Sequence, residues 1–248
     1  MDCLETYDLV KDFAGFRAVD GISLRLAEGQ VLALVGPNGA GKTTLFNLVT
    51  GFVKPTSGRI VLFGDDVTSL PPHRIARRGV ARSFQITSLF EQLSAIEHVV
   101  LALQSPTGLG RRFWAGDVAL RRFDAGAHAL LEEVGLGGLA ARSVGSLPYG
   151  QKRALEIALA LALDPRLLLL DEPTAGMGLD DVRRTIDLIQ RVRSGRTVLL
   201  VDHNMGVVGE LADRVVVMHQ GRVIADGPYE QVRHDPAVVT AYLGQIDA

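Results

Sequence analysis

The hydrophobic positions of this chain form continuous runs in some segments and shorter, interrupted runs in others. Val31–Val35, 167–170 and Thr197–Val201 consist of Val, Leu, Ala and Thr only. Such runs predict strands that are covered on both faces, as in a parallel sheet between helices. Residues 7–26 show shorter apolar runs separated by glycine-containing turns, which predicts antiparallel strands. The chain is therefore expected to be an α/β protein with an N-terminal antiparallel β subdomain.

Helical periodicity dominates the segment 89–163, with loop signals at 106–108 and 135–138. Because strand patterns stand on both sides of it, we expect an inserted helical subdomain. Further helices are predicted at 44–50, 72–78 and 180–193, and a hairpin at 215–225. The predicted organisation is one domain over 1–248, with an α/β core and β subdomain at 1–88 and 164–248 and the helical subdomain at 89–163.

Composition narrows the class of protein. The net charge of -2 does not indicate a nucleic-acid partner. The single cysteine, Cys3, fits a reducing compartment, and acidic residues near the N-terminus do not fit a secretory signal. The apolar stretch 154–170 is interrupted by charges and a proline, so it is not expected to span a membrane. Any link to a membrane is expected to come through partners.

A glycine-rich segment follows the run Val31–Val35 directly. It fits the pattern G-x-x-x-x-G-K-[ST], with a predicted strand before it and a predicted helix after it. In such a loop the backbone N–H groups and the helix N-terminus surround phosphate oxygens. Lys42 is expected at the β- and γ-phosphates, Thr43 at Mg²⁺ and Thr44 at the α- and β-phosphates. The predicted nucleotide-binding residues are Gly36, Pro37, Asn38, Gly39, Ala40, Gly41, Lys42, Thr43 and Thr44.

The run 167–170 leads into two acidic residues. Asp171 is placed to contact Mg²⁺ from behind its ligands or through a water molecule, and Glu172 to polarise a water molecule that attacks the γ-phosphate. An acidic strand end alone is as often structural as catalytic. Together with the upstream glycine-rich loop, the pair predicts an active site.

The segment Leu147-Pro148-Tyr149-Gly150-Gln151 resembles the signature of the ATP-binding-cassette (ABC) ATPases, which usually reads Leu-Ser-Gly-Gly-Gln before a helix. The order of loop, signature and acidic pair is similar to that family over the whole chain. The resemblance implies a P-loop (RecA-like) core. It also implies nucleotide contacts in a partner cassette for Tyr149, Gly150 and Gln151.

Three further residues take a meaning only from this resemblance. It implies that Phe13 stacks on adenine, that Gln85 contacts Mg²⁺ and the attacking water, and that His203 holds the γ-phosphate and that water in line. The implied catalytic residues are Glu172, His203 and Gln85, and the implied metal contacts are Thr43, Gln85 and Asp171. ATP and Mg²⁺ are the implied cofactors.

The resemblance also implies partners and a location. Two cassettes would meet head to tail with two ATP molecules between them, bound to transmembrane permease subunits at the cytoplasmic face of the inner membrane. A substrate-binding protein would take part indirectly. Residues 86–103 would contact the permeases, with Leu89, Phe90 and Leu93 as groove candidates, although ordinary core packing is an equal alternative.

Several segments look like the branched-chain amino acid importers within this family: Val80-Ala81-Arg82-Ser83-Phe84-Gln85, Tyr149-Gly150-Gln151 and Ala241-Tyr242-Leu243-Gly244. Two positions depart from the family pattern. Pro148 replaces a serine, and Gly178 replaces the aspartate of the segment that crosses to the partner. These departures predict that the second cassette is a different chain, with a homodimer as the alternative.

Other functions stay open at this point. Urea or amide importers and lipopolysaccharide extractors share much of the pattern. A soluble ABC ATPase of DNA repair would need a long coiled coil before the signature, which this sequence lacks. A small-molecule kinase would lack the signature and His203.

Overall fold

The computed structural model describes residues 1–83, 89–105 and 122–243. Its strands are β1 (Asp2–Phe13), β2 (Phe16–Ala27), β3 (Val31–Val35), β4 (Ser57–Leu62), β5 (Asp65–Asp66), β6 (Val80–Ser83), β7 (Leu167–Asp171), β8 (Thr197–Val201), β9 (Arg214–His219) and β10 (Arg222–Gly227). Its helices are α1 (Lys42–Val49), α2 (Pro72–Ala76), α3 (Ala95–Gln104), α5 (Asp124–Glu133), α6 (Tyr149–Leu161), α7 (Leu179–Val192), α8 (Met205–Leu211), α9 (Tyr229–Val232) and α10 (Pro236–Leu243), with short 3-10 turns η3 (Gly137–Leu139) and η4 (Val144–Ser146).

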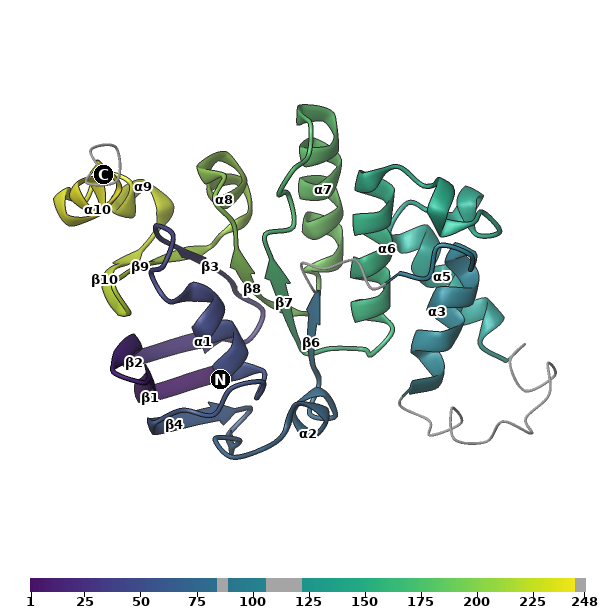
Figure 1. Cartoon of the computed structure of the whole chain (residues 1–248). Coiled ribbons are helices and arrows are strands. Elements are labelled where there is room, and N and C mark those ends of the chain that lie inside the picture. The colour runs from purple at the N-terminus through teal and green to yellow at the C-terminus, as the bar shows by residue number, and fades with distance from the viewer. Residues whose placement is uncertain (84–88, 106–121, 244–248) are drawn as a thin grey trace.

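Two sheets organise the described chain. One is antiparallel in the order β2-β1-β4-β5, and the other has the order β10-β9-β3-β8-β7-β6 (Figure 1). In the second sheet β3, β6, β7, β8 and β9 run parallel, and only β10 pairs antiparallel, at the edge. The predicted α/β class with an N-terminal antiparallel sheet is therefore confirmed.

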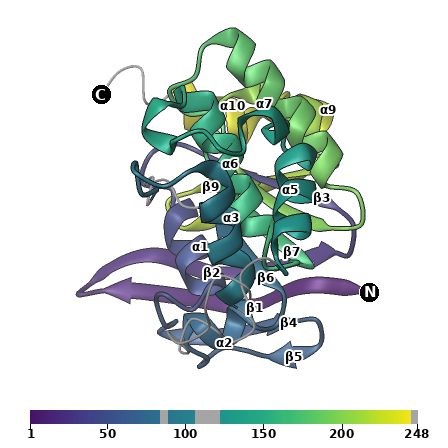
Figure 2. The same cartoon turned by 90° about the vertical axis from the view of Figure 1, so that its right-hand side faces the viewer.

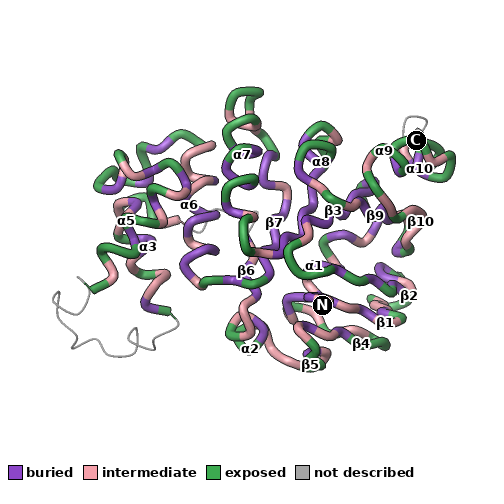
Figure 3. The backbone as a smooth tube through the Cα atoms, turned by 180° about the vertical axis from the view of Figure 1, so that it is seen from behind, coloured by how far each residue is buried: buried purple, intermediate pink, exposed green. Residues whose placement is uncertain are grey.

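The three continuous apolar runs form the centre of the parallel sheet. Every residue of β3, β7 and β8 is buried. Helices and the antiparallel sheet cover the two faces, and in Figure 3 the buried stretches follow these central strands whereas much of α7 is exposed. Burial on both faces explains why these strands read as unbroken hydrophobic runs.

The segment after residue 89 folds into helices that pack on one another. Helices α3, α5 and α6 are in mutual contact, and Figure 2 shows them together on one side of the molecule. The start of α3 is fixed by a capping box, in which Ser94 accepts from the Glu97 N–H and Glu97 accepts from the Ser94 N–H. The division into a core and a helical subdomain with boundaries at 89 and 163 stays a prediction.

Within the described residues, no helix combines the length and the apolar character that crossing a bilayer requires.

Candidate functional site

The glycine-rich loop lies between the end of β3 and the start of α1, where the two sheets approach each other. Gly36 has φ +149°, and a Cβ atom there would lie 2.1 Å from the carbonyl oxygen of Met218 in β9. Gly41 has φ +102°, and its Cβ would lie 2.3 Å from the carbonyl oxygen of Ala18 in β2. Only glycine fits at either position, so both sheets determine the shape of the loop.

Lys42 is folded back onto its own loop. Its Nζ donates to the carbonyl oxygens of Gly36 at 2.6 Å and Pro37 at 2.9 Å, and the residue is 6% exposed. Burial lowers the pKa of Lys42, while the charges of Glu172 and Asp171 oppose that shift. The ammonium group therefore interacts electrostatically with both acidic residues.

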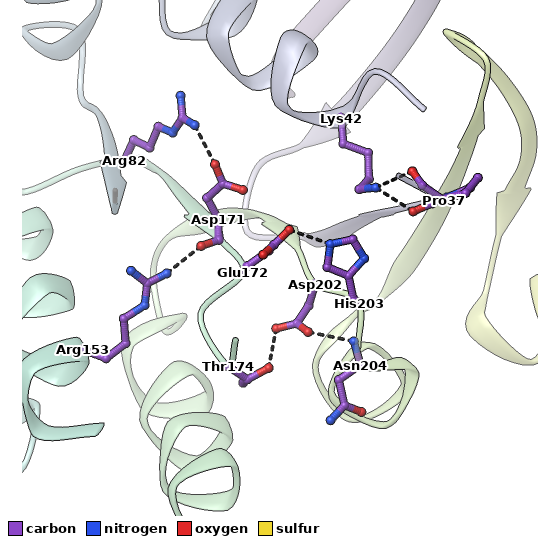
Figure 4. A network of polar contacts seen from close by, with 11 residues as sticks. Pro37, Lys42, Arg82, Arg153, Asp171, Glu172, Thr174, Asp202, His203 and Asn204 are labelled. Atoms are coloured by element: carbon purple, nitrogen blue, oxygen red, sulfur yellow. Dashed lines mark hydrogen bonds and ion pairs between the residues drawn. The ribbon is translucent and has the colours of Figure 1, made fainter. Parts of the chain in front are cut away.

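Asp171 ends β7 and is almost completely buried, with 1% of its surface exposed. Its Oδ2 is 2.6 Å from Nη2 of Arg82, and its backbone oxygen accepts from Nη2 of Arg153 at 2.6 Å (Figure 4). Its Oδ1 has no hydrogen-bond partner among the described residues. A buried carboxylate oxygen without a donor fits a contact to Mg²⁺ or to a water molecule of its shell.

The described residues do not form a metal site from protein ligands alone. The described part of the chain contains no group of three or more His, Cys, Asp or Glu side chains that could hold a metal. Mg²⁺ in nucleotide sites is typically bound through one or two protein ligands plus phosphates. The exposed Thr43 hydroxyl and the buried Asp171 carboxylate fit that mode.

Glu172 and His203 meet at the same edge of the parallel sheet. His203 Nε2 lies 2.6 Å from Glu172 Oε1, and both side chains are partly exposed (Figure 4). They come together because β7 and β8 are parallel neighbours, paired at Asp171 and Val201, and each residue follows the carboxyl end of its strand. Behind them, Asp202 accepts from the Thr174 hydroxyl at 2.7 Å and from the Asn204 N–H at 2.8 Å.

A pocket of 210 Å³ brings most of the predicted residues together. The part of its lining that comes from the loop and α1 consists of Asn38, Gly39, Ala40, Gly41, Lys42, Thr43 and Thr44, and the remainder of Phe16, Ala18, Glu172 and His203. Phe13 is absent from this lining, although it pairs with Phe16 across the β1–β2 hairpin. Lys11 lies over the Phe13 ring at 4.8 Å.

The signature segment lies apart from this pocket. Tyr149 starts α6 and is 51% exposed, and Pro148 is the residue just before the helix, where no side chain caps it. A Cβ on Gly150 would lie 2.8 Å from the Asp181 carboxyl group, so glycine permits close packing of α6 and α7 there. Gly150 and Gln151 line a separate pocket of 330 Å³ with Asp181. One chain alone does not bring the signature and the loop together.

Gln85 lies outside the described residues. Gly178 precedes α7 with φ -73° and ψ 164°, a conformation open to any residue. The absence of an aspartate there is thus a matter of side-chain chemistry and not of backbone geometry.

Sequence reasoning missed the residues that support the site from behind. Arg82 in β6 bonds both Asp171 and Asn47, and Arg153 bonds both Asp171 and Glu156. Burial raises the pKa of Glu156, and the Arg153 contact opposes that shift. The sequence feature that could have pointed to Arg82 is its charge, because it stands inside the four-residue strand β6.

Tyr242 in α10 is a further missed contact. Burial raises the pKa of its phenol, and the nearby Gly36 backbone opposes the rise. The C-terminal helix therefore reaches the first residue of the glycine-rich loop.

A glycine-rich loop between a parallel strand and a helix, with a carboxylate pair at the carboxyl end of another strand of the same sheet, defines a P-loop nucleotide-binding protein. Comparison with known proteins makes the class narrower. The ABC transporter family model matches residues 19–175, and the branched-chain amino acid ATP-binding cassette transporter model matches residues 222–248. The chain belongs to the ABC transporter family and is an ATPase cassette of that family, as the signature segment led us to expect.

Three of the similar proteins illustrate the range of relatives. The high-affinity branched-chain amino acid transport ATP-binding protein BraF of Pseudomonas aeruginosa is 44% identical, with 98% of each chain covered. The lipopolysaccharide export system ATP-binding protein LptB of Escherichia coli is 35% identical, with 99% of this chain and 98% of LptB covered. The crystal structure of the ADP conformation of MJ1267, an ATP-binding cassette of an ABC transporter, has a TM-score of 0.89 at 31% identity, covering 98% of this chain and 99% of MJ1267.

Proposed function

We propose that this cassette powers the import of branched-chain or closely related amino acids. Two similarities support this choice: the high identity to BraF along nearly the whole chain, and the match of the C-terminal residues 222–248 to a branched-chain cassette model. The similarity to LptB keeps lipopolysaccharide export as the second candidate. A urea or amide importer is a further alternative.

The contact between Glu172 and His203 carries the mechanistic part of the proposal, because both residues border the pocket that contains Lys42 and Thr43. Glu172 would accept a proton from the attacking water as general base. His203 would hold that water and the γ-phosphate in line. Lys42 would leave the carbonyl oxygens of its loop and stabilise the charge that develops on the phosphate.

Mg²⁺ would supply charge stabilisation at the β- and γ-phosphates. Thr43 and Asp171 would hold it, together with Gln85. The buried Oδ1 of Asp171, which has no other partner among the described residues, is the structural observation that supports this assignment.

The adenine contact has two aromatic candidates. Phe13 was expected from the resemblance and is 46% exposed, whereas Phe16 is 65% exposed and lines the pocket. We propose that Phe13 stacks on the base, and that Phe16 borders the nucleotide from the neighbouring strand. An exposed aromatic ring gains stacking and apolar contact when a base covers it.

A second cassette would complete the site. Tyr149, Gly150 and Gln151 lie on a different part of the surface from the pocket, so they would contact ATP bound to the partner. Pro148 cannot donate a hydroxyl hydrogen bond there, and Gly178 cannot offer a carboxylate. A different chain as partner would fit such an unequal surface, and a homodimer is the alternative.

The permease contact would lie on the helical part of the chain. An apolar groove of 480 Å³ is lined mainly by residues of α3, among them Ile96, Val100 and Leu101, and by Leu93 just before that helix. Of the three groove candidates, Leu93 lines it, Phe90 is 62% exposed nearby in sequence, and Leu89 packs against the core. Helices of permease subunits would bind here and hold the cassette at the cytoplasmic face of the inner membrane.

The proposed ATP site is tested by measuring ATP binding and hydrolysis with the purified chain, alone and mixed with its partner cassette. Lys42→Ala is expected to lower hydrolysis at least about 100-fold, because a preorganised donor to the developing charge is lost. Lys54→Ala is the matched control, since Lys54 is exposed and lies outside the pocket lining. Hydrolysis by Lys42→Ala at the rate of the unchanged chain would refute the assignment of the site.

A further inference from the structure

The carboxylate of Asp171 is held from one side by a buried arginine. Nη2 of Arg82 lies 2.6 Å from Asp171 Oδ2, and the two side chains are only 10% and 1% exposed. An ion pair so well shielded from water has a fixed geometry and a high cost of disruption. The orientation of this carboxylate is therefore set by Arg82.

Arg82 is itself held by the helix that follows the glycine-rich loop. Its Nη1 donates to Asn47 Oδ1 at 2.6 Å, and its guanidinium lies 5.5 Å from the centre of the Phe46 ring. Both residues belong to α1. A planar guanidinium with donors on two sides can connect α1 to β7 in a way that a lysine ammonium cannot.

The two oxygens of Asp171 thus have different roles. Oδ2 is occupied by Arg82, and Oδ1 has no partner in the described residues. Figure 4 shows one oxygen turned to Arg82 and the other turned away from it. Arg153 donates to the backbone oxygen of Asp171, which fixes the end of the strand.

We propose that Arg82 is a positioning residue for Mg²⁺: it orients the Asp171 carboxylate so that Oδ1 faces the metal of bound Mg-ATP. The inference rests on the proposed role of Asp171. Partners behind a metal-binding carboxylate fix its orientation, and their loss typically costs about 10–100-fold in metal affinity or activity. Arg82 also stands three residues before Gln85, the other expected metal contact.

The test compares nucleotide binding with and without Mg²⁺. A fluorescent ATP analogue is titrated into the purified full-length chain, once in Mg²⁺ and once in EDTA, for the unchanged chain, Arg82→Lys and Asn47→Ala. In EDTA, the affinity of Arg82→Lys for the ATP analogue is expected to stay within about twofold of the unchanged chain. The factor by which Mg²⁺ increases that affinity is expected to be about tenfold smaller in Arg82→Lys. The Mg²⁺ concentration for half-maximal hydrolysis should rise by about 10–100-fold.

Asn47→Ala keeps the charge pair and frees only one side of the guanidinium. It is expected to shift the same two quantities in the same direction by about two- to fivefold, a smaller effect because only one of the bonds around the metal-binding carboxylate is loosened. This variant also carries the test if Arg82→Lys does not fold. Arg193→Lys is the control, because Arg193 pairs with Asp213, which bonds the first residue of β3. This pair therefore lies at the opposite end of β3 from the glycine-rich loop.

The outcomes separate this inference from the proposed function. An unchanged chain that binds no ATP would refute the function itself. An unchanged chain that binds ATP equally well with and without Mg²⁺ would overturn the metal assignment and this inference with it. If Mg²⁺ strengthens binding equally in the unchanged chain and both variants, only the role of Arg82 is overturned.

Discussion

Glu172 illustrates how single residues are held in costly conformations at this site. Its φ of +48° is unusual for a residue with a side chain, and such backbone conformations cost about 1–3 kcal/mol. The bond from its N–H to the Val201 oxygen at 2.7 Å and the contact with His203 stabilise this turn. This backbone conformation places the Glu172 carboxylate past the end of β7, where it lines the pocket.

Cys3 offers a residue-scale prediction about pH. Burial raises the pKa of its thiol to about 11. At about pH 8 only about one thiol in a thousand is then ionised, compared with about one in four for an ordinary cysteine of pKa about 8.5. Alkylation of the native chain by iodoacetamide, followed by mass spectrometry, should be at least about 100-fold slower than in denaturant.

The raised pKa of Cys3 also determines how its alkylation rate changes with pH. Because the pKa is raised, the native labelling rate should climb about tenfold per pH unit from pH about 8 to about 10. Cys3→Ser must show no labelling, since the chain has no other cysteine. Equal rates for the native and the denatured chain would contradict a buried Cys3.

At the scale of elements, the start of α6 gives the clearest prediction. Pro148 precedes the helix with no side-chain cap. In the proposed pair of cassettes, Pro148→Ser would give the signature segment a hydroxyl toward the partner's ATP, and a donor to transition-state charge is worth up to about 100–1,000-fold. We expect an increase of about tenfold in hydrolysis at the partner's site.

The measurement isolates that site by combining Pro148→Ser with Glu172→Gln in this chain, mixed with the unchanged partner cassette. Pro148→Ala, which also removes the proline but adds no hydroxyl, is the matched control and should leave the rate unchanged. Equal rates for the serine and alanine variants would show that the hydroxyl contributes nothing.

The elements with the strongest patterns were the ones that the sequence predicted best. The runs at Val31–Val35 and Thr197–Val201 are strands with the predicted bounds, because burial on both faces leaves an unambiguous signal. The helix expected at 44–50 instead begins at Lys42, since the loop passes directly into the first turn. Helix ends depend on local hydrogen bonds that periodicity does not carry.

The site was predictable as far as short motifs extend. Residues 38–44 of the loop region and Glu172 line one pocket, as their positions at the carboxyl ends of parallel strands predict. His203 lies in the same lining, but the family resemblance and not a motif led us to expect it there. The roles of these residues stay predictions. Arg82, Asn47 and Phe16 were missed because their roles arise from contacts between strands and helices far apart in the sequence. Such pairings depend on sheet order, which local pattern does not determine.

At the scale of the whole molecule, the two sheets meet at the glycine-rich loop. The Gly221 N–H donates to the Ala40 oxygen, and the Asp20 N–H donates to the Gly221 oxygen, each at about 3 Å. The β9–β10 turn of one sheet thus connects the loop to β2 of the other sheet. Movement of either sheet would change the shape of the nucleotide pocket, which suits a cassette whose ATP cycle is coupled to motion.

The groove on α3 and the signature segment lie in the helical part, whereas the pocket lies at the edge of the parallel sheet. The proposed transporter would need both, because ATP would close two cassettes and the permeases would respond to that closure. We propose that hydrolysis in this chain's own pocket drives transport.

Uptake of radiolabelled leucine into proteoliposomes tests that claim most directly. The vesicles contain the chain, its partner cassette and the two permeases, with the binding protein added outside and ATP enclosed. The unchanged chain should give ATP-dependent accumulation, and Glu172→Gln in this chain should reduce it to the level without ATP while ATP still binds. Undiminished accumulation with Glu172→Gln would contradict the claim that this site powers the transporter.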